Sequence, residues 1–164
     1  MYNLNYNQFF KLLDDNNKLY KEFDKYMKID WKKTEEPAPK SIIEMWRNNK
    51  RFIKRKLKFC FLVYKNKYIG SFSYIKTKVG KTRIKNVELN NKIYVKVMIV
   101  YIIPEYRKLG LAYTMLSNIV SKNRCFLYLD NNNLPAYKLY TKLGFKKKGE
   151  DNEESILVNN EKYI

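Results

Sequence analysis

The segment from residue 99 to residue 116 places a strand-like run, two basic residues and a lone glycine in front of a helix-like pattern. The strand-like run ends at Pro104, and Arg107, Lys108 and Gly110 follow it. The first backbone N–H groups of a helix have no partners within the helix, so together with the helix dipole they attract anions. Gly110 has no Cβ, which would let a phosphate group come close to the backbone. The segment therefore predicts a pyrophosphate-binding loop.

The alternative for this segment is an ordinary turn between a strand and a helix, in which Gly110 serves packing alone. Glycine near a helix start is common, so the segment by itself does not decide between the two interpretations. A P-loop is excluded, because the pattern GxxxxGK[ST] does not occur in the chain.

A second segment, NLPAYKLYTKLGF at residues 133 to 145, predicts another helix directly after a strand-like run. Asn133 stands at its start, where an asparagine side chain caps the backbone. Ala136 and Tyr140 share one face of this helix because they are four residues apart. Gly144 stands at the position where a left-handed residue ends a helix. By spacing alone, Tyr140 is a packing residue on the helix face and Asn133 is a helix cap.

The other strand-like runs predict the sheet that positions these helices. Residues 58 to 79 predict a hairpin that turns at residues 65 to 67, and residues 80 to 92 have room for an extra short strand. The sequence further predicts a strand at 92 to 104, a helix at 109 to 121, a strand at 125 to 130 and one or two terminal strands. The strand–helix–strand crossover predicts one parallel pair in an otherwise antiparallel sheet.

The N-terminal third predicts helices. Residues 7 to 29 predict one or two helices with a break near residues 14 to 17, and residues 35 to 40 predict a loop because they hold two prolines. Ser41 is the expected cap of the next helix, with Glu44 at the capping-box position. The apolar face of that helix is expected to hold Ile42, Trp46, Ile53 and Leu57. Residues 1 to 5 offer little support for a first strand.

The segments at residues 99 to 116 and 133 to 145, which we call the chemistry-bearing segments, resemble motifs of a known family. Residues 107 to 112, Arg107-Lys108-Leu109-Gly110-Leu111-Ala112, resemble the R/Q-x-x-G-x-G/A acetyl-CoA signature of the GCN5-related N-acetyltransferase (GNAT) superfamily. Residues 133 to 145 resemble that family's N-x-x-A-x-x-L-Y-x-K-x-G-F segment. The motifs cover residues 97 to 150, and the order of strands extends the resemblance over residues 58 to 160. Both motifs occur in the family's order and on the expected elements.

The resemblance implies an α/β (α+β) fold with a mixed, mostly antiparallel sheet, a central parallel βαβ pair splayed for acetyl-CoA, and helices on both faces. It implies a single domain over residues 1 to 164. Residues 1 to 57 would border the acceptor site, and residues 58 to 164 would form the acetyl-CoA-binding core.

The resemblance also implies an acetyl-CoA-dependent N-acetyltransferase in which a primary amine, on a small molecule or a peptide, attacks the acetyl carbon directly in a ternary complex. The main chain of Val100 and Ile102 would pair with the pantetheine arm, and the N–H of Val100 would polarise the thioester carbonyl. Tyr140 would protonate the departing thiolate. The other implied cofactor contacts are Arg107, Lys108, Leu109, Gly110, Leu111, Ala112, Asn133 and Ala136. No metal is implied.

One departure from the family leaves the general base unassigned. Many relatives carry a glutamate on the strand before the signature, whereas this chain has Lys96 there and no acid between residues 92 and 104. Glu88 is the nearest acid upstream, Glu105 lies on the cofactor side of the turn, and Asp130 ends the following strand. Acceptors that are partly neutral near pH 7 would need no base.

The charge of the chain, +18 with a pI near 9.7, is unevenly distributed. Residues 1 to 46 hold eight lysines and eight acids, so the remainder carries the whole excess. The acids expected on the amine-facing side are Asp14, Asp15, Glu22, Asp24, Asp30, Glu35 and Glu36. The basic residues between 47 and 58 would meet an anion or form a solvated face.

Two other functional classes stay open: a nucleic-acid-associated protein and a catalytically silent acyl-CoA-binding protein on the same fold. The chain has no nucleic-acid motif, so its basicity predicts only non-specific, salt-sensitive binding.

The absence of histidine excludes a histidine base and a histidine-bearing zinc site. Cys60 and Cys125 lie in apolar runs and are expected to be reduced core residues. The start does not read as a signal peptide and no apolar run reaches membrane-spanning length, so a soluble cytoplasmic protein is expected, and a homodimer stays open.

Overall fold

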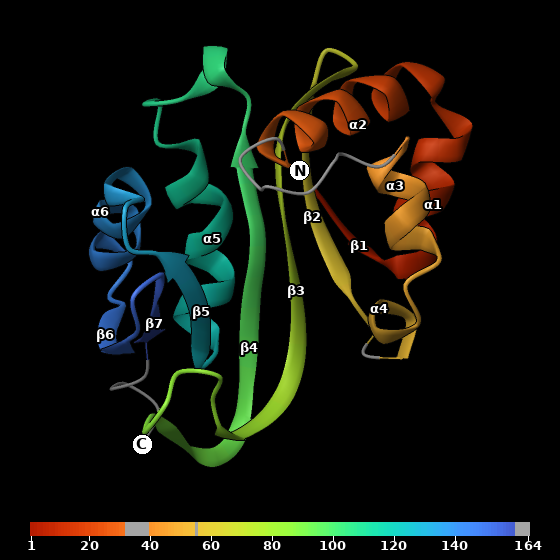
Figure 1. Ribbon diagram of the computed structural model, residues 1–164. Coiled ribbons are helices and arrows are strands. Elements are labelled where there is room, and N and C mark those ends of the chain that lie inside the picture. The colour runs from red at the N-terminus through yellow and green to blue at the C-terminus, as the bar shows by residue number, and fades with distance from the viewer. Residues whose placement is uncertain (32–39, 55, 160–164) are drawn as a thin grey trace. The chain divides into compact units, whose positions relative to one another are not determined.

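The computed structural model describes residues 1–31, 40–54 and 56–159 (Figure 1). Its elements, in chain order, are β1 (Tyr2–Asn5), α1 (Tyr6–Asp15), α2 (Asn17–Trp31), α3 (Ile42–Arg47), α4 (Lys50–Lys54), β2 (Lys58–Tyr64), β3 (Lys67–Lys81), β4 (Glu88–Ile102), a 3-10 turn (Pro104–Tyr106), α5 (Leu111–Lys122), β5 (Cys125–Asp130), α6 (Leu134–Lys142), β6 (Lys146–Glu150) and β7 (Glu154–Asn159).

The strands form a seven-stranded sheet in the order β1-β2-β3-β4-β5-β7-β6. Strands β4 and β5 pair in parallel, whereas β1 with β2, β5 with β7 and β6 with β7 pair antiparallel. The parallel pair is the one joined through α5, because a parallel connection needs a crossover element. The predicted fold class, a mixed and mostly antiparallel sheet with one central parallel pair, is confirmed.

The chain divides into two compact units. Unit 1 comprises residues 1–73 and 101–107, and unit 2 comprises residues 74–100 and 108–164. The core of unit 1 is aromatic: the ring of Phe9 stacks on Phe59 at 3.7 Å between centroids, and Phe23 meets Phe61 edge-on at 5.4 Å. Aromatic pairs of this kind add to the free energy gained from burying their area.

A first strand is present, contrary to the expectation for residues 1 to 5. Strand β1 pairs with β2 from Tyr2–Phe61 to Asn5–Lys58. The sequence YNLN has weak strand propensity of its own, so the neighbouring strand β2 determines its conformation. The side chain of Asn5 then caps α1 by accepting a hydrogen bond from the Gln8 N–H.

The helical region at 7 to 29 is two helices, with the predicted break at Asn16. The backbone N–H of Asn16 donates to the Leu13 carbonyl at the end of α1, and its side-chain oxygen accepts from the Leu19 N–H at the start of α2. One residue therefore caps both helices. The loop predicted at residues 35 to 40 falls almost entirely outside the described residues.

The single helix predicted after Ser41 is in fact two short helices, α3 and α4. Ser41 caps α3 as predicted, accepting from the Glu44 N–H at 3.2 Å, while the Glu44 carboxylate lies near Tyr20 and Arg47. The helix ends at Arg47, and the Asn49 side chain accepts from the Arg51 N–H to begin α4. Because of this break Ile53 is 52% exposed, so the predicted apolar face is not continuous.

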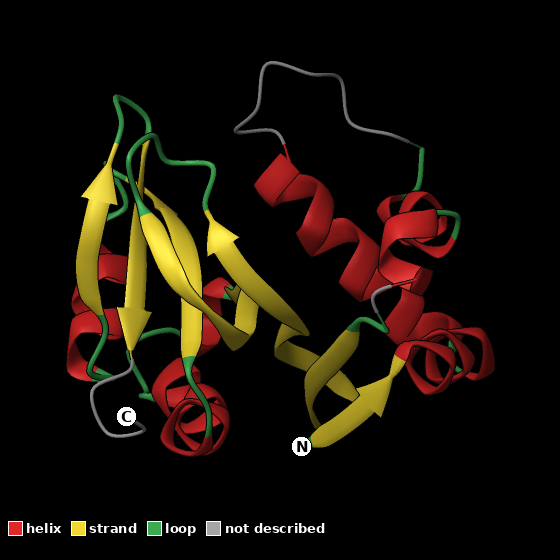
Figure 2. Ribbon diagram, turned by 90° about the horizontal axis from the view of Figure 1, so that it is seen from below, coloured by secondary structure: helices red, strands yellow, loops and turns green. Residues whose placement is uncertain are grey.

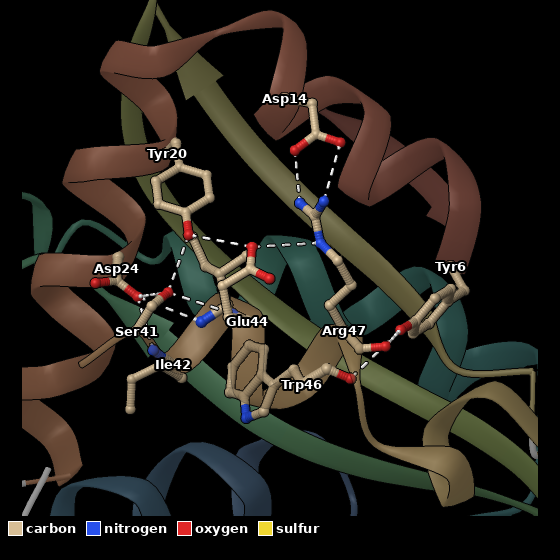
Figure 3. A network of polar contacts seen from close by, with 10 residues as sticks. Tyr6, Asp14, Tyr20, Asp24, Ser41, Ile42, Glu44, Trp46 and Arg47 are labelled. Carbon is tan, nitrogen blue, oxygen red and sulfur yellow. Dashed lines mark hydrogen bonds and ion pairs between the residues drawn. The ribbon is translucent and has the colours of Figure 1, made fainter. Parts of the chain in front are cut away.

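A buried carboxylate joins α2 to α3 in unit 1 (Figure 3). Asp24 is 8% exposed, and its Oδ1 accepts from Ser41 Oγ at 3.1 Å, from the Ile42 N–H at 2.8 Å and from the Ile43 N–H at 3.3 Å. Its Oδ2 forms an ion pair with Lys28 Nζ at 2.7 Å. Four donors, three on Oδ1 and one on Oδ2, therefore depend on this one carboxylate.

We expect Asp24→Ala to lower the free energy of unfolding by about 3 kcal/mol, because partly buried donors lose their acceptor. The matched control is Asp15→Ala, which removes an exposed ion pair with Lys11 and should cost less than about 1 kcal/mol. Urea denaturation of the two variants measures the difference. Equal losses would show that the Asp24 contacts contribute no more than a surface ion pair.

Unit 2 contains helices α5 and α6 and the strands beside them, whereas residues 101–107 of the first segment belong to unit 1, and the strands of unit 2 form a twisted layer with helices beside it (Figure 2). Strand β3 runs to Lys81 and β4 begins at Glu88. Residues 80 to 92 therefore lengthen a hairpin and do not form the extra short strand for which the sequence has room. Strand β5 has the predicted bounds, Cys125–Asp130, and two terminal strands follow α6.

Both cysteines are buried and free, as predicted. Burial raises the pKa of the Cys60 thiol to about 11 and that of the Cys125 thiol to about 12. Because the thiolate is the reactive form, neither residue is suited to nucleophilic chemistry.

Candidate active site

The parallel strands β4 and β5 separate part-way along their length. Their pairing, within the described chain, consists of Val95 with Cys125 and Lys96 with Phe126. Strand β5 then continues to Asp130, paired with β7 on its other side, and β4 continues within unit 2 as far as Val100. We call this divergence the fork. Beyond Lys96 and Phe126 the two strands share no further residue pair in the part of the chain that the structure describes.

A left-handed residue lies on β4 inside the fork. Ile99 has φ of 52°, three residues after the last pair with β5 and directly before Val100. A β-branched residue with positive φ is an outlier that costs about 1–3 kcal/mol and persists only where the surroundings impose it. The sequence did not predict this distortion, because IVYII reads as an uninterrupted strand.

Gly110 stands directly before α5 as its N-cap, with φ of 75°. A Cβ built at this position would meet nothing within 4 Å, so the glycine is not required by packing. Lys108 is also left-handed, with φ of 63°. The helix begins at Leu111, two residues later than predicted. The open space in front of Gly110 favours the anion-binding interpretation over the packing alternative.

The start of α5 has unpaired donors facing that open space. No side chain caps the helix within the described chain, and the first helical bond runs from the Thr114 N–H to the Gly110 carbonyl at 3.0 Å. The N–H groups before Thr114 therefore have no helical acceptor, which is the arrangement that binds phosphate oxygens.

The side chain of Arg107, the first residue of the signature, contacts residues at the end of β4 in unit 1. Its Nε donates to the Ile102 carbonyl at 2.8 Å, and its guanidinium carbon lies 5.3 Å from the centroid of the Tyr101 ring. The side chain of Arg107 thus stabilises the end of β4, a role that the sequence motif did not reveal. Leu109, between the basic residues and Gly110, is 67% exposed.

Helix α6 is fixed at both ends as the sequence predicted. The side-chain oxygen of Asn133 accepts from the Ala136 N–H at 3.2 Å, which confirms it as the N-cap. At the other end Gly144 has φ of 88°, and the Phe145 N–H donates to the Tyr140 carbonyl at 2.9 Å. This is a Schellman motif, and it anchors the backbone of Tyr140.

The side chain of Tyr140 is 7% exposed and contacts Phe145 edge-on, with 5.6 Å between ring centroids. Burial raises the pKa of the Tyr140 hydroxyl above its usual range. A raised pKa means that the proton stays on the hydroxyl through neutral and moderately alkaline pH. Tyr140 can therefore donate a proton, and it cannot serve as a general base near pH 7.

Of the acids considered as bases, Glu88 lies at the opposite end of its strand from the fork. Glu88 begins β4, and Val100 is twelve residues further along the same strand, about 40 Å away at about 3.3 Å per residue. Glu88 is therefore too far from the fork to act there, which corrects its role as a candidate base.

Four N-terminal acids expected on the amine-facing side have local partners in unit 1. Asp14 pairs with Arg47, Asp15 with Lys11 and Asp24 with Lys28, and the Glu22 carboxylate accepts from the Tyr68 N–H at 3.0 Å. The side chains of Asp30, Glu35 and Glu36 lie outside the described residues. The general base stays unassigned.

A group of three side chains at the fork was missed by sequence reasoning. Lys96 Nζ lies 5.3 Å from the centroid of the Tyr128 ring, and the guanidinium carbon of Arg83 lies 3.8 Å from the same centroid. Arg83 also forms an ion pair with Glu154 and donates its backbone N–H to the Tyr128 hydroxyl at 3.2 Å. These residues come from three separate segments, so no local pattern joins them.

Within residues 1–31, 40–54 and 56–159, no group of three or more acidic or cysteine side chains is arranged to hold a metal ion. Among the described helices, none combines the length and apolarity needed to span a membrane.

Comparison with known proteins gave a family match and a set of similar folds. The model of the acetyltransferase (GNAT) family matches residues 17–145. No curated protein matched the chain. The PaiA N-acetyltransferase of Thermoplasma acidophilum, solved with coenzyme A, is similar with a TM-score of 0.55 and 18% identity, over 90% of this chain and 94% of that one.

Two further solved structures share the fold. Naa50 of Arabidopsis thaliana, in complex with the bisubstrate analogue CoA-Ac-MVNAL, has a TM-score of 0.52 and 18% identity over 70% of this chain and 82% of its own. A GNAT family acetyltransferase of Elizabethkingia anophelis with acetyl-CoA bound has a TM-score of 0.51 and 12% identity over 77% and 93%.

Proposed function

Because the chain belongs to the acetyltransferase (GNAT) family, we propose that it transfers an acetyl group from acetyl-CoA to a primary amine at the fork between β4 and β5. The observations that carry this proposal are the end of β4–β5 pairing at Lys96–Phe126 and the uncapped first N–H groups of α5, the helix that connects these two strands. The uncapped helix start suits the pyrophosphate, and the fork suits the extended pantetheine arm, whose amides need main-chain partners.

In this proposal the amine nitrogen attacks the acetyl carbon, the carbon–sulfur bond breaks, and the thiolate takes the proton of the Tyr140 hydroxyl. The attacking nitrogen becomes positively charged and loses its proton to water, and water returns a proton to the Tyr140 phenolate. The Val100 N–H donates to the thioester oxygen as negative charge develops there. Proximity supplies much of the acceleration, since binding replaces a bimolecular encounter.

The residues of unit 2 proposed to contact the cofactor are Val100, Lys108, Leu109, Gly110, Leu111, Ala112, Asn133, Ala136 and Tyr140. Ile102 and Arg107, which belong to unit 1, stay predictions from the family motif. The Asn133 side chain already caps α6, so its contribution to the cofactor would come from the helix end it stabilises.

The experiment that tests the proposal begins with mass-spectrometric detection of CoA copurified with the protein. A screen of acetyl-CoA turnover across a panel of amines follows. Copurified or added CoA species that raise Tm, together with amine-dependent release of CoA, support acetyl transfer. Turnover without any amine dependence would contradict it.

A catalytically silent acyl-CoA-binding protein is the second candidate, favoured by the lysine that stands at the fork in place of an acid. Such a protein would show the Tm increase with acetyl-CoA and no transfer to any amine.

We expect acceptors that are partly neutral near pH 7 to react fastest, because no carboxylate has been assigned as a base. An α-amino group with a pKa of about 7.7–8.0 should outperform a lysine ε-amine of about 10.4. The rate should rise with pH from 6 to 9 and level off near the pKa of the acceptor, since the neutral amine is the nucleophile. Competition among a peptide with a free N-terminus, an amino sugar, spermidine and a lysine-rich peptide measures this.

Preference for spermidine or for the lysine-rich peptide at neutral pH would overturn the expectation. It would require a base supplied from a residue other than Glu88.

A further inference from the structure

Helix α4 and the residues directly after it carry a dense group of cations that the proposed reaction does not use. We call this group the basic segment; its members are basic and exposed, namely Lys50, Arg51, Lys54, Lys56 and Lys58. The chain has no acid between Glu44 and Glu88. Within the described chain, no acid forms an ion pair with any member of the basic segment. Their charges are therefore available to a partner outside the chain.

The backbone of unit 1 holds the basic segment in a defined place. At the start of α4 the Asn49 side chain accepts a hydrogen bond from the Arg51 N–H at 3.0 Å. After the helix Leu57 is fully buried, and Lys58 pairs with Asn5 as the first residue of β2. The cations thus project from a stretch of chain that is anchored at both ends, so they can be presented together to a partner.

An exposed isoleucine lies among these cations. Ile53 and Lys54 are three and four residues after Lys50, so the three side chains lie on one face of α4. Ile53 is 52% exposed. Removing the exposed part of this aliphatic side chain from water would be favourable, which gives a partner with an apolar layer an advantage over a purely polar one. The face therefore combines positive charge with apolar surface.

Two kinds of polyanion could neutralise the charge of the basic segment, and Ile53 distinguishes them. A nucleic acid presents phosphate groups along a polar backbone, so it would leave Ile53 in water. An anionic lipid surface presents phosphate and carboxylate groups directly above an apolar layer, so it accepts the cations and the isoleucine together. The combination of charges with an exposed aliphatic side chain favours the lipid surface.

We propose that the basic segment binds an anionic lipid surface, with Ile53 inserted between the headgroups. The binding is peripheral, because α4 comprises only Lys50–Lys54 and is far too short to cross a bilayer. Each cation held near an anionic surface raises the partition coefficient about fivefold, and burial of the exposed half of an isoleucine raises it by about the same factor. Neither the fork nor the loop before α5 takes part, so the proposal is independent of acetyl transfer.

Cosedimentation of the full chain with lipid vesicles tests the proposal. One set of vesicles contains phosphatidylcholine alone, and the other contains equal parts of phosphatidylcholine and phosphatidylserine. The wild-type protein should bind the anionic vesicles at least about a hundredfold more tightly. Added salt should weaken this binding, because it screens exposed charges. Equal binding to the two sets of vesicles, or binding to neither, would overturn the proposal.

Charge variants separate the basic segment from the net charge of the whole chain. One variant removes three charges of the segment: Lys50→Gln, Lys54→Gln and Lys56→Gln. Its partition coefficient for anionic vesicles should fall about a hundredfold. The control removes three exposed lysine charges of unit 2 and so has the same net charge: Lys76→Gln, Lys78→Gln and Lys85→Gln. Its partition coefficient should fall less than about fivefold. Equal losses in the two variants would show that binding follows net charge and would overturn the assignment to this segment.

The Ile53→Ser variant tests the apolar contact with every charge retained. Its partition coefficient for anionic vesicles should fall about fivefold. Ile93→Ser is the matched control, because Ile93 is a 65% exposed isoleucine on β4 in unit 2. It should bind like the wild-type protein. An unchanged partition coefficient in Ile53→Ser would contradict insertion between the headgroups.

Binding to a single-stranded RNA in the same buffer covers the alternative partner. Tighter binding to RNA than to anionic vesicles, lost in the lysine variant of the segment and unaffected by Ile53→Ser, would overturn the lipid surface and assign the basic segment to nucleic acid. All substituted side chains are exposed, so the variants should keep the wild-type Tm. The comparison of the two sets of vesicles with the wild-type protein decides the proposal even if a variant fails to fold.

Discussion

The Gly110→Glu variant should lose its response to acetyl-CoA completely. At a concentration one hundred times its Kd, acetyl-CoA should stabilise the wild-type protein by about 2.7 kcal/mol, seen as a higher Tm. Gly110 has φ of 75° and open space where a Cβ would stand, directly in front of the uncapped start of α5. A glutamate there would place a side chain and a negative charge where the pyrophosphate is expected. The increase in Tm should fall to zero.

Two control variants separate occupation of the site from backbone strain. Gly144→Glu introduces the same side chain at a glycine with φ of 88° and equally open surroundings, at the end of α6. Gly110→Ala introduces the strain of positive φ with little bulk. Both should have a lower Tm than the wild type and should still respond to acetyl-CoA. An unchanged response in Gly110→Glu would refute the assignment of the pyrophosphate to this loop.

The Tyr140→Phe variant should lower kcat at least tenfold, equivalent to about 1.4 kcal/mol of barrier, with little change in affinity for acetyl-CoA. The hydroxyl is needed only when the thiolate forms, and the ring contact with Phe145 is preserved in the variant. Tyr137→Phe is the matched control, since it removes a hydroxyl from an exposed tyrosine of the same helix.

The pH dependence gives a second readout for Tyr140. Because burial raises the pKa of its hydroxyl, the wild-type rate should not fall between pH 7 and pH 9 through loss of this proton. Equal kcat values for Tyr140→Phe and the wild-type protein would exclude Tyr140 from proton transfer and leave it as a packing residue.

Much of the fold follows from local sequence patterns. The break at Asn16, the caps at Ser41 and Asn133, and the left-handed Gly144 were all predicted, because each depends on the preferences of one or two residues. Strand β5 was predicted to the residue because an apolar run stands between a polar turn and a polar helix start.

Other features depend on partners far away in the sequence. Strand β1 forms because β2 supplies its hydrogen bonds, although YNLN has little strand propensity. The divergence of β4 and β5 and the positive φ of Ile99 are properties of tertiary packing, since IVYII carries no glycine or turn residue to indicate a distortion. Lys96, Tyr128 and Arg83 meet only once the strands are paired. Sequence motifs located the candidate cofactor loop, whereas the contacts of Lys96 and Arg83 with Tyr128 became visible only in the structure.

The most direct test of acetyl transfer at the fork is the stoichiometry of the reaction with a purified amine. The protein is incubated with acetyl-CoA and aminoethyl phosphate or a peptide with a free N-terminus, and free CoA and acetylated amine are quantified together by mass spectrometry. We expect the two products to appear in equal amounts with the wild-type protein and neither to appear with Gly110→Glu. If acetyl-CoA raises Tm while no amine in the panel becomes acetylated, the result would contradict acetyl transfer. It would identify the chain as a protein that binds acetyl-CoA without catalysing transfer.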